Sequence, residues 1–285
     1  MATEIGNFTN DSAMMLAYER ALETSRPDAL FQDRFATVLA GHKGKELSDM
    51  FGSCCSSFDF GDWPEFHKVW AAVRTKFIDD TIAKHAASGK FPQLVNLGAG
   101  FDTRPYRLEC YQAFTHGSFE VDMETINANK AKVLEEFLGQ PPPHCSQVRS
   151  VNLDLLDGEA TLSAELQKAS FDAAQPAIFL AEGLVQYLGD EGRWKLVRDV
   201  SAAAAPGSVL VLQFLDASES AAAAAMGAGM SAAEAAAALE GRGWEQLEFA
   251  RFGDERLSFG RFPAERFRPS ALFSFVVCVK SAPAP

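Results

Sequence analysis

The sequence predicts an α/β fold in which a helical N-terminal block precedes a largely parallel sheet of seven strands. Two observations predict it. From about residue 11 to residue 90 apolar side chains recur with helical spacing, whereas from Phe91 onward short apolar runs alternate with helical patterns. Such alternation is typical of βαβ units, in which a crossover helix follows each strand. With 285 residues, 47% of them hydrophobic, the chain is long enough to bury a sizeable core.

The N-terminal block is predicted to contain two main helices. The first has apolar residues at i, i+3, i+4 and i+7, namely Met14, Ala17, Tyr18 and Ala21. The second runs from about Glu65 to His85. Between them, the Gly/Ser/Cys/Phe stretch from Phe51 to Trp63 is predicted to be a loop.

Seven short apolar runs are the predicted strands. They are Leu94–Leu97, Ser118–Val121, Val148–Leu153, Ala177–Ala181, Val209–Phe214, Trp244–Phe252 and Leu272–Lys280. Apolar faces beginning at Ile126 and at Trp194 predict intervening helices, the second of which stops at Pro206-Gly207. Ser218–Leu239 is almost all alanine, so we expect a poorly specified surface helix or a mobile insert; the alternative is a movable cap over a ligand site.

Composition and charge exclude several classes of protein. The formal net charge of −12 repels phosphate backbones and no basic stripe is visible, so we expect no nucleic-acid partner. No apolar run approaches the roughly 18 residues of a membrane helix, and the opening residues lack a secretory signal pattern. We therefore expect a cytoplasmic protein without a membrane partner. The five cysteines form no CxxC pair, which predicts reduced thiols and no metal site.

A glycine turn follows the first predicted strand, in Asn96-Leu-Gly-Ala-Gly-Phe-Asp-Thr103. Gly98 and Gly100 let a ligand approach the backbone because no Cβ is in the way. A dinucleotide fingerprint would have a third glycine at Thr103, and Pro105 indicates a short first helical turn rather than a long phosphate-binding helix. The turn therefore suits a nucleoside without phosphates better than NAD or FAD. The alternative is a plain strand-to-helix turn.

Acidic residues stand at the ends of the next three strands. Asp122 comes 22 residues after Gly100, where this topology commonly uses a carboxylate to accept both ribose hydroxyls. Asp154 and Leu155 are suited to bond an adenine amino group and to pack its ring, and Glu182 is expected at the mouth of the sheet beside the glycine turn. Singly, each acid has the alternative of an exposed strand end or a helix cap. Their coordination with the glycine turn favours a nucleoside site.

One arginine stands on an apolar helix face. Trp70, Arg74, Phe77 and Ile78 fall at i, i+4, i+7 and i+8, so they share one side of the second N-terminal helix. An arginine in that position needs an anion, and we expect Arg74 to bind a carboxylate. The alternative is that its side chain reaches past the face to water.

Four motifs occur in order along the chain. They are Asn96-Leu-Gly-Ala-Gly-Phe-Asp-Thr-Arg-Pro-Tyr-Arg-Leu108, Glu120-Val-Asp122 with Lys130 downstream, Leu153-Asp-Leu-Leu-Asp157 and Ala181-Glu-Gly-Leu-Val-Gln-Tyr-Leu188. Together they resemble the leucine carboxyl methyltransferase family of S-adenosylmethionine-dependent O-methyltransferases, which includes members linked to polyketide and other secondary metabolism. The resemblance implies a Rossmann-like seven-stranded methyltransferase sheet. It also implies a helical lid or substrate cap over residues 1–90 and a core over 91–285, with the Ala-rich insert at about 217–240.

The resemblance implies how the cofactor, S-adenosyl-L-methionine, would be bound. Gly98 and Gly100 would pass under its methionine part. Asp122 would hold the ribose, and Asp154 with Leu155 would contact the adenine.

The resemblance also implies a place for the chemistry. Arg74 would bind the carboxylate of the cofactor, Glu182 would lie near its amino end, and Tyr187 matches a family tyrosine close to the transferred methyl and the acceptor. Arg74 and Tyr187 are therefore the predicted catalytic residues.

The absence of a histidine from the strand-end motifs bears on the methyl acceptor. An ionised carboxylate needs no base, whereas a phenol or alcohol does, and His67 would be the candidate. We therefore expect methylation of a small carboxylic acid to its methyl ester. A protein C-terminal carboxyl methyltransferase and a non-catalytic S-adenosylmethionine-binding protein remain the alternatives, while Thr103 disfavours a nicotinamide oxidoreductase.

Overall fold

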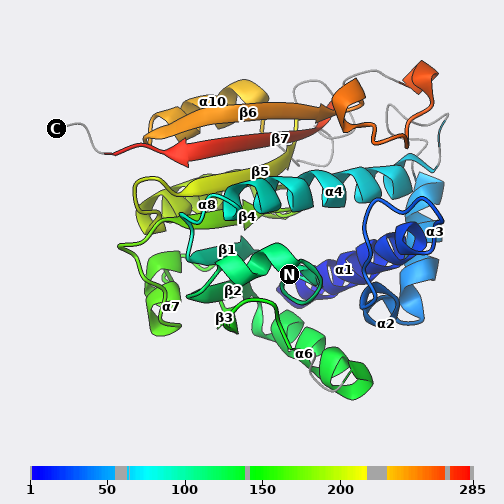
Figure 1. Cartoon of the computed structure of the whole chain (residues 1–285), viewed down its shortest axis with the longest axis horizontal. Helices are drawn as coiled ribbons and strands as arrows, with labels where there is room; N and C mark the ends of the chain where they lie inside the picture. The colour runs from blue at the N-terminus through cyan, green and yellow to red at the C-terminus, as the bar shows by residue number, and fades with distance from the viewer. Residues whose placement is uncertain are drawn as a thin grey trace.

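A seven-stranded sheet runs through the centre of the protein, in a computed structural model that describes residues 2–54, 63, 65–138, 142–216, 230–266 and 270–282 (Figure 1). The strand order is β3-β2-β1-β4-β5-β7-β6. Neighbouring strands are parallel, except that β7 is antiparallel to both β5 and β6. The strands are β1 (Gln93–Leu97), β2 (Gly117–Asp122), β3 (Val148–Asn152), β4 (Ala177–Ala181), β5 (Val209–Leu215), β6 (Trp244–Phe252) and β7 (Ser270–Lys280). The predicted fold class and all seven predicted strands are confirmed.

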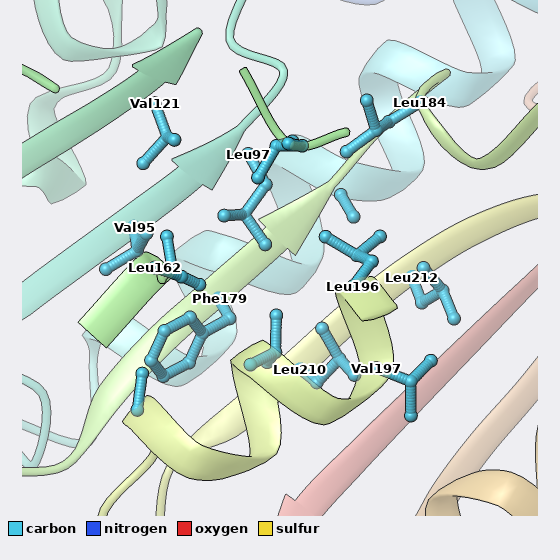
Figure 2. Close-up of a cluster of buried hydrophobic side chains, with 14 of the residues drawn as sticks. Val95, Leu97, Val121, Leu162, Phe179, Leu184, Leu196, Val197, Leu210 and Leu212 are labelled. Carbon is cyan, nitrogen blue, oxygen red and sulfur yellow. The ribbon is translucent and has the colours of Figure 1, made fainter. Parts of the chain in front are cut away.

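Helices cover both faces of the sheet, and β4 shows how. Ile178 and Leu180 pack into the cluster that contains α4 (Phe66–Ala86). Phe179 and Ala181 pack on the other face, toward α8 (Gly189–Ala203). Because every residue of β4 is buried, the strand reads as a continuous apolar run. Figure 2 shows the second cluster, where Phe179 is fully buried; its truncation to alanine would cost about 3–5 kcal/mol of stability.

In the described part of the N-terminal block, the helices are α1 (Ala2–Thr24), α2 (Ala36–Ala40), α3 (Lys43–Cys54) and α4. The predicted second helix agrees with α4 within a residue at each end. The predicted loop was placed too early, because Phe51 still belongs to α3. Its ring packs edge-on against His67, with the ring centroids 5.4 Å apart, and this contact favours continued helix. Residues 55–62 of the predicted loop lie outside the described residues.

The remaining helices connect the strands. They are α5 (Arg104–Arg107), α6 (Glu124–Leu138), α7 (Leu162–Lys168), α8 and α10 (Ala232–Glu240), with short 3₁₀ turns at η2 (Glu109–Ala113), η3 (Val185–Tyr187), η4 (Glu255–Leu257) and η5 (Ala264–Arg266). Helix α8 ends at Ala203, three residues before Pro206, as predicted. Among the described residues no helix has the length and apolar character needed to cross a membrane.

Only part of the Ala-rich segment can be compared with its prediction. Residues 217–229 lie outside the described part of the chain. The remainder contains α10, which begins with a capping box between Ser231 and Glu234. Ala235 and Leu239 are buried in the cluster shown in Figure 2, so this helix is docked on the sheet.

Candidate active site

A crevice opens at the carboxyl ends of β1, β2 and β4, where the predicted site residues meet. It is lined by all eight of them: Arg74, Gly98, Gly100, Asp122, Asp154, Leu155, Glu182 and Tyr187. Parallel strands end at the same edge of a sheet, and this crevice lies where open α/β sheets commonly bind ligands. The structure thus brings the predicted residues together, although it does not assign their roles.

The glycine turn forms the floor of the crevice. Gly98 and Gly100 have φ angles of 63° and 48°, a conformation that favours glycine. A Cβ on Gly98 would lie 2.9 Å from Leu184 Cδ1, which is too close for an ordinary contact. After the turn, α5 is only four residues long and has Pro105 in its first turn. The prediction of a short helix, unlike the long helix that binds a pyrophosphate, is confirmed.

Asp122 is fixed by the backbone around it. Its Oδ2 accepts a hydrogen bond from Gly100 N at 2.7 Å, and its Oδ1 accepts one from Met123 N at 2.8 Å. Burial raises the pKa of Asp122, although these two hydrogen bonds oppose the rise. Each carboxylate oxygen retains a lone pair for a further donor. The residue can therefore hold the glycine turn and still accept two ligand hydroxyls.

The next wall of the crevice has one polar and several apolar groups. Asp154 is exposed, and its Oδ1 accepts a hydrogen bond from Leu156 N at 2.9 Å. Leu155 is buried, and Met123 and Ile126 also line this part of the crevice. An apolar wall beside an exposed carboxylate suits a flat ring that carries an amino group.

Glu182 lies in a buried ionic network. Its Oε2 accepts a hydrogen bond from Arg104 Nη1 at 2.7 Å, and its Oε1 lies 2.7 Å from Arg74 Nε. Arg104 also pairs with Asp79 and Asp102. Burial opposes ionisation of Glu182, but the charges of Arg104 and Arg74 hold its pKa below the usual value. The network fixes a carboxylate beside the glycine turn, as the sequence predicted.

The network also shows what sequence reasoning missed. Arg104 forms ion pairs with three carboxylates and is 3% exposed. In the sequence, only its place at the end of the motif Gly98-Ala-Gly-Phe-Asp-Thr-Arg104 indicated a role for it. Burial opposes ionisation of Asp102, but the charges of Arg104 and Lys130 outweigh burial and lower its pKa. These charges stabilise one another below the crevice.

The sequence predicted an anionic partner for Arg74, and in the structure this partner is Glu182. The arginine is 7% exposed and shares its helix face with buried Trp70, Phe77 and Ile78. Its Nε is near Glu182 but makes no well-directed hydrogen bond. A Cβ on Gly183 would lie 3.1 Å from Arg74 Nη1, so the guanidinium rests on this backbone. Arg74 therefore presents its positive charge at the crevice.

Helix α1 covers the crevice. Tyr187 Oη and Ser12 Oγ are 3.0 Å apart, and Arg20 Nη2 donates a hydrogen bond to Phe101 O at 2.7 Å. A Cβ built on Gly100 would lie 3.7 Å from Ala13 Cβ. Residues at two places along α1, 12–13 and Arg20, thus join it to the glycine turn and to η3.

A second cavity, of about 390 Å³, adjoins the crevice. The two share Ser12, Leu16, Arg74, Gly183 and Tyr187. The other described residues that line the cavity are Met15, Glu19, Phe51, His67, Trp70, Gln186, Gln213, Leu215 and Phe273. Its size is in the range that holds small organic ligands. Two ligands bound in these spaces would meet beside Arg74 and Tyr187.

The sheet defines a Rossmann-like α/β protein with a crevice at the ends of its parallel strands. Two crystal structures share this fold. A DUF574 family protein of Streptomyces avermitilis has a TM-score of 0.61 at 18% identity, covering 94% of this chain and 97% of that one. A Thermobifida fusca protein described as a "putative methyltransferase" has a TM-score of 0.61 at 17% identity, covering 87% and 93%.

The family follows from the sequence comparisons. The profile of the leucine carboxyl methyltransferase family matches residues 13–201, and the chain belongs to this family. A Parafrankia protein is 36% identical over 206 residues, covering 71% of this chain and 62% of the relative. A Mycolicibacterium smegmatis protein is 34% identical over 222 residues, covering 76% and 69%. Both are named "putative S-adenosyl-L-methionine-dependent methyltransferase". The predicted family is confirmed, and these names support the predicted cofactor.

Proposed function

We propose that the protein is an S-adenosylmethionine-dependent O-methyltransferase that converts a carboxylate of a small molecule to its methyl ester. The observation that carries this proposal is the meeting of two spaces at Arg74 and Tyr187. One is the crevice with the glycine turn and strand-end acids, and the other is the adjoining cavity. A methyltransferase needs this arrangement, because cofactor and acceptor must be bound side by side.

The crevice fits the cofactor in its shape and donor set. Gly98 and Gly100 line the crevice without side chains, so a methionine chain can lie against the backbone there. We infer that Asp122 accepts the ribose hydroxyls, and that Asp154 and Leu155 contact the adenine. Arg74 would attract the carboxylate of the methionine part, and Glu182 its ammonium group. Apart from the apolar packing of Leu155, each of these pairings joins opposite charges or a donor with an acceptor.

The residues of the chain would act mainly by positioning. The bound cofactor supplies a methyl group on a positively charged sulfur, and transfer requires the acceptor oxygen to stand in line with it. Tyr187 and Ser12 would hold the acceptor end of the cavity, and α1 would exclude water from it. An acceptor carboxylate is already ionised at neutral pH, so no proton has to be removed from it. Such positioning can supply several kcal/mol of the barrier.

We further propose that residues 1–90 serve as the lid and substrate cap, and 91–285 as the core. The contacts of α1 with the glycine turn and Tyr187 support this division. Helix α4 is buried against the sheet, so the movement is assigned to the helices before it. Hydrogen exchange within α1 should slow when S-adenosylhomocysteine is added, while exchange in β4 stays unchanged. Equal slowing in both segments, or none in α1, would contradict a lid.

Label transfer tests the proposed reaction. The protein is incubated with methyl-labelled S-adenosylmethionine and a panel of small carboxylic acids, peptides and phenols, and the labelled product is identified. We expect label in a small acid, released as methanol by mild alkali as methyl esters are. Label at a peptide C-terminus would favour a protein carboxyl methyltransferase instead. Cofactor binding without transfer to any acceptor class would support a non-catalytic binding protein.

A further inference from the structure

The end of the cavity farther from the crevice carries a buried Glu–His pair. Glu19 Oε1 lies 2.5 Å from His67 Nδ1 and accepts a second hydrogen bond from Ser48 Oγ at 3.0 Å. Glu19 is 1% and His67 3% exposed, and both line the cavity. A carboxylate at Nδ1 orients the ring and favours the tautomer whose Nε2 has the free lone pair. Among the described residues, none is hydrogen-bonded to Nε2.

Helix geometry gives the distance between this pair and the crevice. Ser12 and Glu19 are seven residues apart on α1, and His67 and Arg74 are seven residues apart on α4. Seven residues of α-helix span about 10 Å. The two helices run in opposite directions (Figure 1), so both spacings measure the same length of cavity. From the same helical rise, the Glu–His pair lies about 10 Å from the end of the cavity that borders the crevice.

The walls of the cavity are mostly apolar and partly flat, although Gln186 and Gln213 also line it. Trp70 is four residues before Arg74 and three after His67, which places it midway on α4. Its ring stacks on Phe273 with centroids 4.3 Å apart and an interplanar angle of 18°. Met15 and Leu215 line the cavity as well. Such walls bind a slender or aromatic body and offer it few hydrogen bonds.

We propose that the cavity selects an elongated acceptor with an apolar, preferably aromatic, body and a hydroxyl group at its far end. One end presents the methyl-accepting group beside Arg74 and Tyr187, and the other donates a hydrogen bond to His67 Nε2. This proposal rests on the proposed function and names its substrate class. His67 determines specificity, and Glu19 is a positioning residue that acts through it.

The position of His67 argues against its use as the base for methyl transfer. A general base must lie within hydrogen-bond reach of the proton it removes. About 10 Å of helix separates His67 from the shared end of the cavity, so the reacting oxygen is out of its reach. A hydroxyl at the far end of the acceptor is within reach of Nε2, and its hydrogen bond would contribute to selection.

A pair of rigid acids tests the proposal. The full-length protein, with and without S-adenosylhomocysteine, is titrated calorimetrically with 4′-hydroxybiphenyl-4-carboxylate and with biphenyl-4-carboxylate. We expect the hydroxylated acid to bind about tenfold more tightly, as one satisfied hydrogen bond predicts. The variant His67→Phe keeps an aromatic ring beside Phe51 and should bind both acids equally. Glu19→Ala should lose most of the preference, and Glu19→Gln, which can still accept from Nδ1, should retain more of it.

The outcomes separate this proposal from the proposed function. If the two acids bind the wild-type protein equally, or neither binds, the proposal is wrong whatever the cofactor does. If S-adenosylhomocysteine fails to bind, the proposed function is wrong, while the titrations without it still measure the preference. A third assay locates the labelled methyl group: label on the phenolic oxygen would place the hydroxyl end beside Arg74 instead of His67 and overturn the proposal. Unchanged S-adenosylhomocysteine affinity shows that each variant is folded.

Discussion

Removing the hydroxyl of Tyr187 can show whether this residue has a catalytic or a structural role. Tyr187 Oη and Ser12 Oγ are 3.0 Å apart, so Tyr187→Phe and Ser12→Ala remove the same hydrogen bond from opposite sides. Each loss should lower the free energy of unfolding by about 0.5–1.5 kcal/mol. Only Tyr187→Phe also removes the hydroxyl from the junction of crevice and cavity, while it keeps the ring.

Turnover should therefore differ between the two variants. If the hydroxyl positions the acceptor in the transition state, Tyr187→Phe should lower kcat about tenfold or more, which corresponds to roughly 1.4 kcal/mol of barrier. Ser12→Ala should lower it less than threefold. The assay is single-turnover methyl transfer at saturating cofactor and acceptor, with urea unfolding of both variants as the control. Equal losses of turnover would refute the catalytic assignment and leave Tyr187 as an anchor for α1.

Three further changes test the crevice itself. Asp122→Ala should weaken S-adenosylhomocysteine binding by about 1.5–3 kcal/mol, because charge-assisted hydrogen bonds to the ribose are lost; unchanged calorimetric affinity would exclude it from the site. The carboxyl of Glu182 has a lowered pKa when folded, so its stabilising effect is complete above the ordinary glutamate pKa of about 4.3 and is lost as the pH falls toward the folded value. The free energy of unfolding, measured in urea, should thus differ most between wild type and Glu182→Gln at pH 7, and the difference should shrink as the pH falls below about 4.3. A difference that does not depend on pH would contradict the ion pairs. Gly98→Ala should cost about 1–3 kcal/mol of stability and weaken cofactor binding. The control is Gly89→Ala, which has a similar φ of 66° and nothing within 4 Å of its Cβ, and should leave binding unchanged. Equal effects of the two substitutions would argue against a crowded glycine turn.

The central strands β1, β2, β4 and β5 could be predicted closely because they are buried on both faces. Ala177–Ala181 was predicted with the bounds that the structure has, as was the more exposed edge strand Trp244–Phe252. A strand that is buried on both faces has a continuous apolar run, which can be recognised in the sequence. The end of α3 could not be predicted in this way, because Phe51 packs against the ring of His67, which lies on another element and is not visible in the local sequence.

The candidate site was predictable where it follows the strand ends. Gly98, Asp122 and Glu182 stand at positions that the topology itself brings to one edge. The ion pairs of Glu182 and the contact between Glu19 and His67 were not predictable. The latter joins residues 48 positions apart on two helices, and neither helix has a local pattern that indicates the other.

Calorimetric titration of the full-length protein with S-adenosylmethionine, and separately with NAD, tests the central claim most directly. The crevice has a glycine turn held by Asp122, but only a four-residue helix follows the turn. We therefore predict one S-adenosylmethionine bound per chain, with binding weakened by Asp122→Ala, and no measurable binding of NAD. Absence of S-adenosylmethionine binding, or tighter binding of NAD, would contradict the account.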